Sequence, residues 1–497
     1  MIFAWILFSI YMLGTLYLGW LGYRRTHNFD GFAIGSGDLH PAIVGITMAA
    51  SVASAATFII NPGFIYVHGL AAFMHMAVAV GSGFTGMLIL LSFRFRRLGA
   101  ENHALTMPHW IGLRFGSRGF AIFFAMVNLL ALAFVVLIVG GLSIVMQQML
   151  HLSNTAALII ILVFVTGYVF IGGTYAHVFT NTLQGSLMII VTLLIFASGL
   201  HFFKGEGLFA QIGAIDPNLT GLINPKSNLF NNVFSVYISG FLIGAALVCQ
   251  PHILTKALYV RSDRALKQYL IYGVTILGVF LLLPFAGFFT RLAIPPEQLV
   301  DASTGAFRQD LAMIAYVHQA FPPFVFTFIS VVLLAAGMST LDGILVSMST
   351  ITSNDLIVNL VQKIKGKGNS AENFALAYKL SHIVLVIIAM LAFLICLNPP
   401  KLLGIFGQVG VYGMAVAAVP PLLIGVLFKR APLGIVWAAA AGGLFIHFFL
   451  YFLGPKLLPN SGITFANPGV TAALALIVSA LPALIAVWLL GTREAKN

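Results

Sequence analysis

The chain of 497 residues is 60% apolar and only 8% charged, with a mean hydropathy of +1.02. This composition excludes a water-soluble globule, which needs more polar surface, and it predicts a protein whose solvent is the lipid bilayer. In a soluble protein, the formal charge of +12 would suggest a nucleic-acid partner. Here the basic residues lie in short loops between apolar runs of about twenty residues, where they set topology, so we expect no nucleic-acid partner.

Apolar runs bounded by charged residues or by Pro, Gly and Asn predict about thirteen transmembrane helices. Their ranges are 2–23, 39–68, 70–93, 118–150, 153–172, 177–202, 232–256, 267–291, 323–361, 375–397, 401–428, 431–453 and 467–491. If the N-terminus faces outward, the inner loops carry 19 of the 25 Lys and Arg residues. The positive-inside rule therefore predicts a multi-pass protein of the cell membrane with its N-terminus outside and its C-terminus in the cytoplasm.

No connection has the composition of a flexible linker, so we expect residues 1–497 to form a single transmembrane domain. Five spans fill residues 39–202 and five more fill 232–428. Because five is odd, the second block must be inverted relative to the first, which is the geometry of an inverted repeat. The run at 2–23 is then an extra first helix, and 431–491 holds two extra helices at the end. The inner stretch 107–115 is either a short interfacial helix with an aromatic anchor or a solvated loop.

The first span of each block is a poor lipid-facing helix. The second span of the chain is rich in small and hydroxyl residues from Gly45 to Thr57 and ends in Pro62-Gly63, and the seventh runs from Ser239 into Gln250-Pro251-His252. Broken helices in corresponding positions of two repeats are where such transporters place their sites, because unwound backbone there offers carbonyl oxygens and helix ends.

The ninth span carries a stripe of small and hydroxyl-bearing residues. Ala336, Ser339, Thr340 and Gly343 recur at i, i+3, i+4 and i+7, so they share one face of the helix. Two hydroxyl oxygens facing the carbonyls of a broken helix would make an all-oxygen cage for a hard monovalent cation. Stripes of this kind are also common packing devices between membrane helices, and spacing leaves both readings open.

Four sets of motifs now carry a family resemblance. They are Ala336-Gly337-Met338-Ser339-Thr340-Leu341-Asp342; Asn61-Pro62-Gly63-Phe64 with Gly69; Gly172-Gly173-Thr174-Tyr175-Ala176 followed by Thr180-Asn181-Thr182-Leu183-Gln184-Gly185; and Gln250-Pro251-His252 with Gly425-Val426-Leu427-Phe428-Lys429-Arg430. Together they resemble the sodium/solute symporter family, which includes proline, sugar, pantothenate, sialic acid and monocarboxylate symporters. The resemblance implies an all-α membrane protein with the ten-helix inverted-repeat core of the leucine transporter, one helix before it and two after.

The resemblance also implies a sodium site. Its ligands would be the backbone oxygens of Ala50, Ala53 and Ala336 and the hydroxyls of Ser339 and Thr340. Each of these positions holds a residue able to supply the required oxygen.

Two positions depart from the family pattern. Asn181 stands where most relatives have an aspartate, which in some is linked to a second cation site or to its entry path, and its neutral amide predicts one sodium ion per solute. Val52 replaces an aspartate that some members use near the first site. Asp342 is then the one acidic residue well inside a predicted span, either as a proton or cation sensor or as a helix-to-helix hydrogen-bond acceptor.

The solute pocket should lie between the two broken spans, with Ser54, Thr57, Asn61, His75 and Gln408 as its polar groups. A sugar needs many hydrogen-bond partners in its pocket, because each buried hydroxyl without one weakens binding by about 1–3 kcal/mol. So few polar groups favour a small organic acid or an amino acid, with its carboxylate held by a helix N-terminus or backbone amides.

The sequence therefore predicts a sodium-coupled symporter, not an enzyme, that imports a small organic solute by alternating access. Its expected partners are the solute, sodium and the lipid bilayer, and the oligomeric state stays open. A proton-coupled carrier of the same fold and a transporter-like sensor are the alternatives. A haem subunit is disfavoured because most histidines fall at span ends or in loops, and a channel because no filter motif or ring of like charge is visible.

Overall fold

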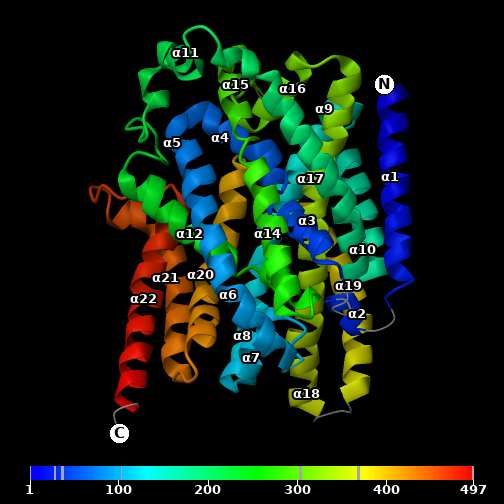
Figure 1. Cartoon of the computed structure of the whole chain (residues 1–497), viewed down its shortest axis with the longest axis vertical. Coiled ribbons are helices and arrows are strands. Elements are labelled where there is room, and N and C mark those ends of the chain that lie inside the picture. Colours follow the sequence, from blue (N-terminus) through cyan, green and yellow to red (C-terminus); the bar gives the residue numbers. More distant parts are fainter. Residues whose placement is uncertain are drawn as a thin grey trace.

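Helices form nearly all of the molecule in a computed structural model that describes residues 2–26, 29–34, 39–101, 103–300, 305–365 and 370–494 (Figure 1). The helical stretches long and apolar enough to cross a membrane are α1 (Ile2–Tyr23); α5 (Leu70–Phe73) continuing through Met74–Ala79 into α6 (Val80–Glu101); α8 (Arg118–Val127) continuing into α9 (Leu132–Leu150); α10 (Asn154–Ser198); α14 (Asp263–Phe280) with α15 (Phe285–Ala293); α17 (Pro323–Thr350) continuing through Ile351–Val358 into α18 (Asn359–Lys365); α19 (Ser370–Leu397); α20 (Leu403–Leu427); α21 (Leu433–Leu457); and α22 (Pro468–Glu494). Shorter helices lie in the connections: α2 (Phe29–Ala33), α7 (Met107–Phe115), α11 (Leu208–Ile215) and α16 (Ala312–Ala320).

Two further spans are bent pairs. The first joins α3 (Pro41–Val52) to Ala56–His68, whose second part is α4 (Asn61–His68), at an angle of 51°. The second joins Phe234–Leu247, which includes α12 (Ser239–Leu247), to Pro251–Tyr259, which begins with α13 (Pro251–Leu254), at 63°. These are the two spans in which the sequence predicts interruptions.

The helix α10 accounts for the difference between the counted spans and the expected thirteen. The described residues contain ten candidate spans, or twelve with the bent pairs. At 1.5 Å per residue the 45 residues of α10 would measure about 68 Å, more than twice the roughly 30 Å of a bilayer's hydrocarbon core. Gly173, with φ 51° and ψ −137°, breaks α10 into two halves, each long enough to span. A side chain there would also collide with the ring of Phe32, so both the backbone and the packing require glycine.

The stretch 107–115 forms the helix α7. Thr106 caps it by accepting a hydrogen bond from His109 N at 3.1 Å, and Gly116 ends it in the left-handed region at φ 62°. The expected aromatic anchor, Trp110, does not lie at the membrane surface. Its side chain is buried, and the indole N–H donates to Phe95 O at 3.2 Å. Trp110 therefore fixes α7 to the protein rather than to the membrane surface.

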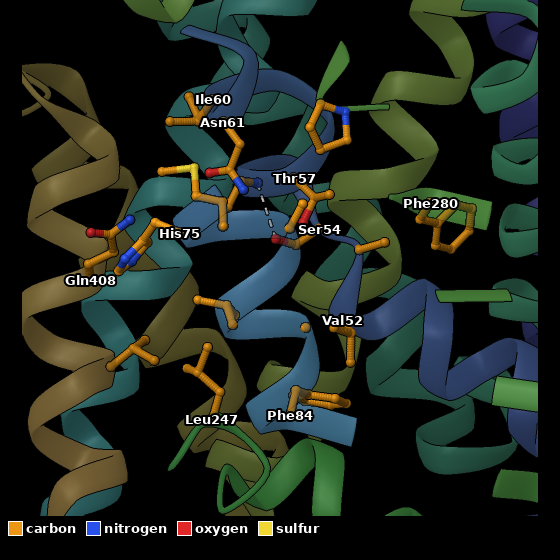
Figure 2. A pocket seen from close by; sticks show the side chains of 18 of the residues that line it. Val52, Ser54, Thr57, Ile60, Asn61, His75, Phe84, Leu247, Phe280 and Gln408 are labelled. Carbon is orange, nitrogen blue, oxygen red and sulfur yellow. Dashed lines mark hydrogen bonds between the residues drawn. The ribbon is translucent and has the colours of Figure 1, made fainter. Parts of the chain in front are cut away.

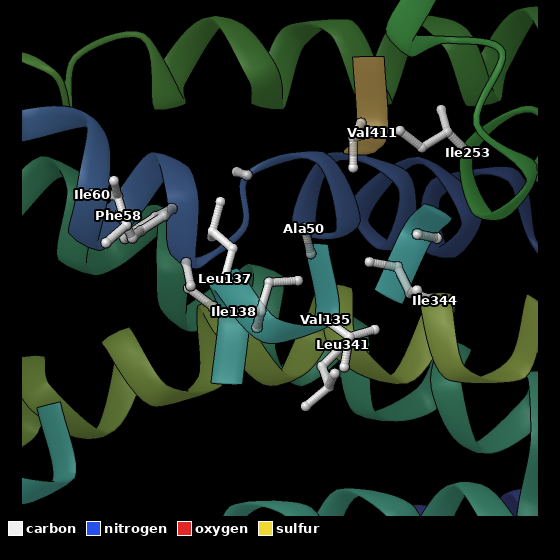
Figure 3. Packing of buried hydrophobic residues seen from close by; sticks show 14 of the residues in the cluster. Ala50, Phe58, Ile60, Val135, Leu137, Ile138, Ile253, Leu341, Ile344 and Val411 are labelled. Atoms are coloured by element: carbon white, nitrogen blue, oxygen red, sulfur yellow. The ribbon is translucent and has the colours of Figure 1, made fainter. Parts of the chain in front are cut away.

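The long helix α17 lies at the centre of the bundle, with α3, α9 and α10 packed against it and α1 on the periphery against α10 (Figure 1). Figure 3 shows the apolar contact of these helices, with Ala50, Val135 and Leu341 close together. All three side chains are fully buried, and so is the hydroxyl stripe of α17 beside them. The small residues of α3 and α17 thus let the two backbones approach closely enough for direct hydrogen bonds.

Candidate cation and solute site

The break in the first bent pair is made by local hydrogen bonding. Ala53 ends α3 with φ −80° and ψ 69°, and its N–H donates to Ala49 O at 2.9 Å. Ser54 Oγ then accepts from Ala56 N at 3.1 Å and so caps the second half. The chain can turn here because Ala53 and Ser54 lack bulk. Carbonyls at the end of α3 that have lost their helical partners become available to α17.

Carbonyls of α3 and hydroxyls of α17 meet directly. The Ser339 hydroxyl lies 2.9 Å from Ala50 O and 2.8 Å from Ala336 O, and Thr340 Oγ1 donates to Ser51 O at 2.9 Å. Both hydroxyls are fully buried. Four of the five predicted cation ligands thus gather at one crossing of α3 and α17, and Ala53 lies at the adjoining break.

This crossing has the chemistry of a sodium site, because all of its facing groups are neutral oxygens. Carbonyl and hydroxyl oxygens are the ligands that hard cations take from proteins. The Thr340 hydroxyl reaches Ser51 O, a carbonyl that the sequence argument did not single out. Only the packing of α3 on α17 reveals Ser51, since nothing in its local pattern distinguishes it from Ser54.

Asn181 of α10 joins the same crossing as a hydrogen-bond donor. Its amide Nδ2 lies 2.7 Å from Ser339 O and 3.1 Å from Ser51 Oγ. A carboxylate could not donate to a carbonyl in this way. At this position the amide links α10, α3 and α17 instead of offering a negative charge.

Asp342 is surrounded by donors. Its carboxylate accepts from Tyr168 Oη at 3.0 Å, Thr180 Oγ1 at 3.2 Å and Gly343 N at 2.7 Å, and it lies 2.8 Å from His177 Nδ1. The side chain is fully buried. Of the two roles expected for Asp342, this geometry supplies the helix-to-helix hydrogen bond, joining α17 to α10.

Lys256, the last residue of the predicted span 232–256, is one of the 19 basic residues assigned to the inner loops, and the structure places it elsewhere. It lies within Pro251–Tyr259, is fully buried, and donates through Nζ to His252 O at 2.6 Å. The surrounding sequence resembles a basic loop because Arg261 and Arg264 follow closely. The bend after α12 is what carries Lys256 into the bundle.

A cavity of about 720 Å³ opens beside the cation ligands (Figure 2). All five predicted solute contacts line it: Ser54, Thr57, Asn61, His75 and Gln408. Ser51 and Ala53 also line it, so the break in the first bent pair faces both the crossing with α17 and the cavity. The rest of the lining is mainly aliphatic and aromatic, and the described lining residues include no Asp, Glu, Lys or Arg.

A second hollow, of about 780 Å³, adjoins this cavity and shares Phe64, Leu229 and Ile405 with it. The loop before α22 is tied to the segment at Leu229 by a hydrogen bond of 2.9 Å from Asn467 Nδ2 to Leu229 O. Asn467 itself lines the cavity. The loop that leads into the last accessory helix therefore contributes to the cavity wall, a contact that the sequence did not predict.

Comparisons with known proteins agree with this architecture. The model of the sodium:solute symporter family matches residues 32–442. The chain is 24% identical over 457 residues to a sodium/pantothenate symporter of Haemophilus influenzae, covering 91% of this chain and 90% of that protein. It is also 24% identical over 456 residues to a sodium/proline symporter of Staphylococcus aureus, covering 89% and 83%.

Solved structures show the same fold. A sodium-coupled sialic acid symporter in a substrate-bound, outward-open state matches with a TM-score of 0.74 at 16% identity, covering 96% of each chain. A transporter of the nucleobase-cation-symport-1 family matches with a TM-score of 0.53 at 14% identity, covering 92% of this chain and 94% of that one. The expected leucine-transporter-like fold is thereby confirmed.

Proposed function

Because the chain belongs to the sodium:solute symporter family, we propose that it imports a small organic solute together with sodium by alternating access. The observation that carries this proposal is the contact between Ala50 O and the Ser339 hydroxyl, next to a cavity of about 720 Å³. A cation held there would fix the broken helix against α17. The same break presents Ser54 and Thr57 to the solute.

One sodium ion per solute is the proposed stoichiometry. Its ligands are the oxygens of Ala50, Ala53, Ala336, Ser339 and Thr340. Support for a single ion comes from the groups around it: Asn181 donates toward the crossing, and the Asp342 carboxylate already faces four donors. A second cation beside Asp342 would displace these donors, and beside Asn181 it would meet one neutral amide oxygen in place of a carboxylate.

The proposed arrangement has residues 39–202 and 232–428 as inverted repeats, with the N-terminus outside and the C-terminus in the cytoplasm. Support comes from the two bent pairs, which open the two blocks, and from the excess of basic residues on one set of loops. Rocking of the repeats about a site near the midplane would expose the cavity to each side in turn. The sodium gradient would supply the driving force.

A small organic acid or amino acid is the proposed solute. The two relatives named above for proline and pantothenate have solutes with a carboxylate. Most of the described lining residues are apolar and none is Asp, Glu, Lys or Arg, which suits a solute with an apolar body better than a sugar. A carboxylate is favoured at the N-terminal end of the helix half that begins at Ala56.

A thermal-shift screen of the purified protein tests this function. Small organic acids and amino acids are added in sodium and, separately, in choline at equal ionic strength. Binding to the folded state raises the melting temperature by mass action, so a solute of this carrier gives a larger shift in sodium. Equal shifts in both salts, with a response to pH instead, would favour the proton-coupled carrier. Sodium-dependent binding without uptake into proteoliposomes would favour the sensor.

A further inference from the structure

His75 projects into the cavity with its two ring nitrogens in different settings. Nδ1 lies 3.0 Å from both Ser235 O and Val236 O, at the start of the second bent pair. Carbonyl oxygens can only accept, so Nδ1 must carry the proton. The ring is wedged in place by Phe230, with ring centroids 5.0 Å apart, and by Gly240, where a side chain would meet Nδ1.

With the proton fixed on Nδ1, Nε2 of a neutral His75 is an acceptor. Both hydrogen bonds of His75 among the described residues use Nδ1. Nε2 can therefore accept a hydrogen bond from a solute in the cavity. In the solute-free cavity an imidazolium would be a buried cation, and no carboxylate stands among the described lining residues to compensate it. The lone pair of Nε2 therefore repels a carboxylate and attracts an N–H or O–H group.

On the basis of the proposed function, we propose that His75 selects solutes by accepting a hydrogen bond from a donor group they carry beside the carboxylate. The solute class is then a 2-hydroxy or 2-amino acid with a compact apolar body, rather than a plain monocarboxylate. Figure 2 shows the His75 ring and the Gln408 side chain close together at the left of the view, and both residues line the cavity. The carboxylate lies away from His75, toward the break at Ser54.

Matched probes test this selection by calorimetry in saturating sodium: isovalerate, 2-hydroxyisovalerate and valine, which share one apolar body. We expect the wild type to bind at least one donor-bearing probe about tenfold more tightly than isovalerate, since a neutral buried hydrogen bond gained or lost changes affinity by about this factor. His75→Asn keeps an N–H in place of Nδ1 but removes Nε2. In this variant the ratio of the affinity for the donor-bearing probe to the affinity for isovalerate should fall to about one.

Two further variants keep the test decisive. His75→Gln places an amide near the Nε2 position and should restore part of the preference, even if the asparagine variant folds poorly. His151→Asn is the matched control, because His151 lies outside the cavity at φ 54°, a conformation that asparagine adopts readily.

Equal wild-type affinity for isovalerate and both donor-bearing probes, or an unchanged preference in both His75 variants, would overturn the inference. Loss of sodium dependence with the preference intact would instead count against the proposed coupling alone. If none of the three probes bound, the substrate class would be wrong, whereas a sodium-induced thermal shift without solute would still support the cation site.

Discussion

The Ser339→Ala variant should bind sodium more weakly without losing its fold. A contact between a hydroxyl oxygen and a charged group contributes about 1.5–3 kcal/mol. In the cation-free state the same hydroxyl donates to Ala50 O or Ala336 O, a neutral bond that contributes about 1 kcal/mol and is also lost. The difference, about 0.5–2 kcal/mol, predicts a two- to thirtyfold rise in the half-saturating sodium concentration.

Uptake into proteoliposomes, measured against sodium concentration at fixed ionic strength, gives this value. Ser330→Ala is a matched control on the same helix, since Ser330 is equally buried and its Oγ has no hydrogen-bond partner within the described part of the chain. The control should keep the wild-type half-saturation. If Ser339→Ala lowered the melting temperature but left half-saturation unchanged, the hydroxyl stripe would be a packing device and the cation assignment would be wrong.

Four further outcomes are expected. Thr340→Val, which keeps the shape but removes the hydroxyl bonded to α3, should raise half-saturating sodium in the same uptake assay by a similar factor; an unchanged value would remove Thr340 from the ligand set. Wild-type uptake should rise with sodium at a Hill coefficient near one, because Asn181 brings no charge to a second ion; a coefficient near two would refute this. Burial raises the pKa of Asp310 from 3.8 to about 6, so the folded state holds this proton more tightly and stability is lost as pH rises through 6. Asp310→Asn should therefore raise the free energy of unfolding at pH 7.5 by on the order of 3 kcal/mol at most, measured as a higher melting temperature, and not at pH 3.5; equal shifts in melting temperature at both pH values would contradict the assignment. Gly173→Ala should fold poorly in a detergent-stability assay, since it needs φ 51° and space against Phe32; normal stability would show that the break can shift.

The interrupted helices were predictable from sequence because their cause is local. The small and hydroxyl-bearing residues around Ala53 and Ser54 make a poor lipid-facing helix. Pro251 has no N–H and cannot continue the hydrogen bonding of the helix before it. The alternation of apolar runs and basic loops likewise predicted the spans, and the kink at Gly173 separates two of them within one continuous helix. Short-range chemistry therefore determines much of this fold.

The polar interior was less predictable, because its partners are far apart in the chain. Asp342 meets Tyr168 and His177, which lie 174 and 165 residues away. The burial of Lys256 depends on the 63° bend between α12 and α13, which is a tertiary feature. No local spacing encodes such contacts.

The His75 tautomer belongs with these long-range features. It depends on Ser235 O and Val236 O, carbonyls of the second bent pair that lie about 160 residues away in the chain. The sequence predicted His75 as a solute contact but could not show which ring nitrogen carries the proton. The two bent pairs therefore define the cavity together: one presents the hydroxyls of Ser54 and Thr57, and the other fixes the acceptor.

Reciprocal binding tests the coupled mechanism most directly. If sodium and solute occupy neighbouring parts of one broken helix, each must raise the other's affinity by the same factor. Calorimetry measures solute affinity in sodium and in choline, and then sodium affinity with and without solute. The account predicts equal, more than fivefold enhancements in both directions, the lower end of typical coupling energies. Equal solute affinity in sodium and choline would contradict it.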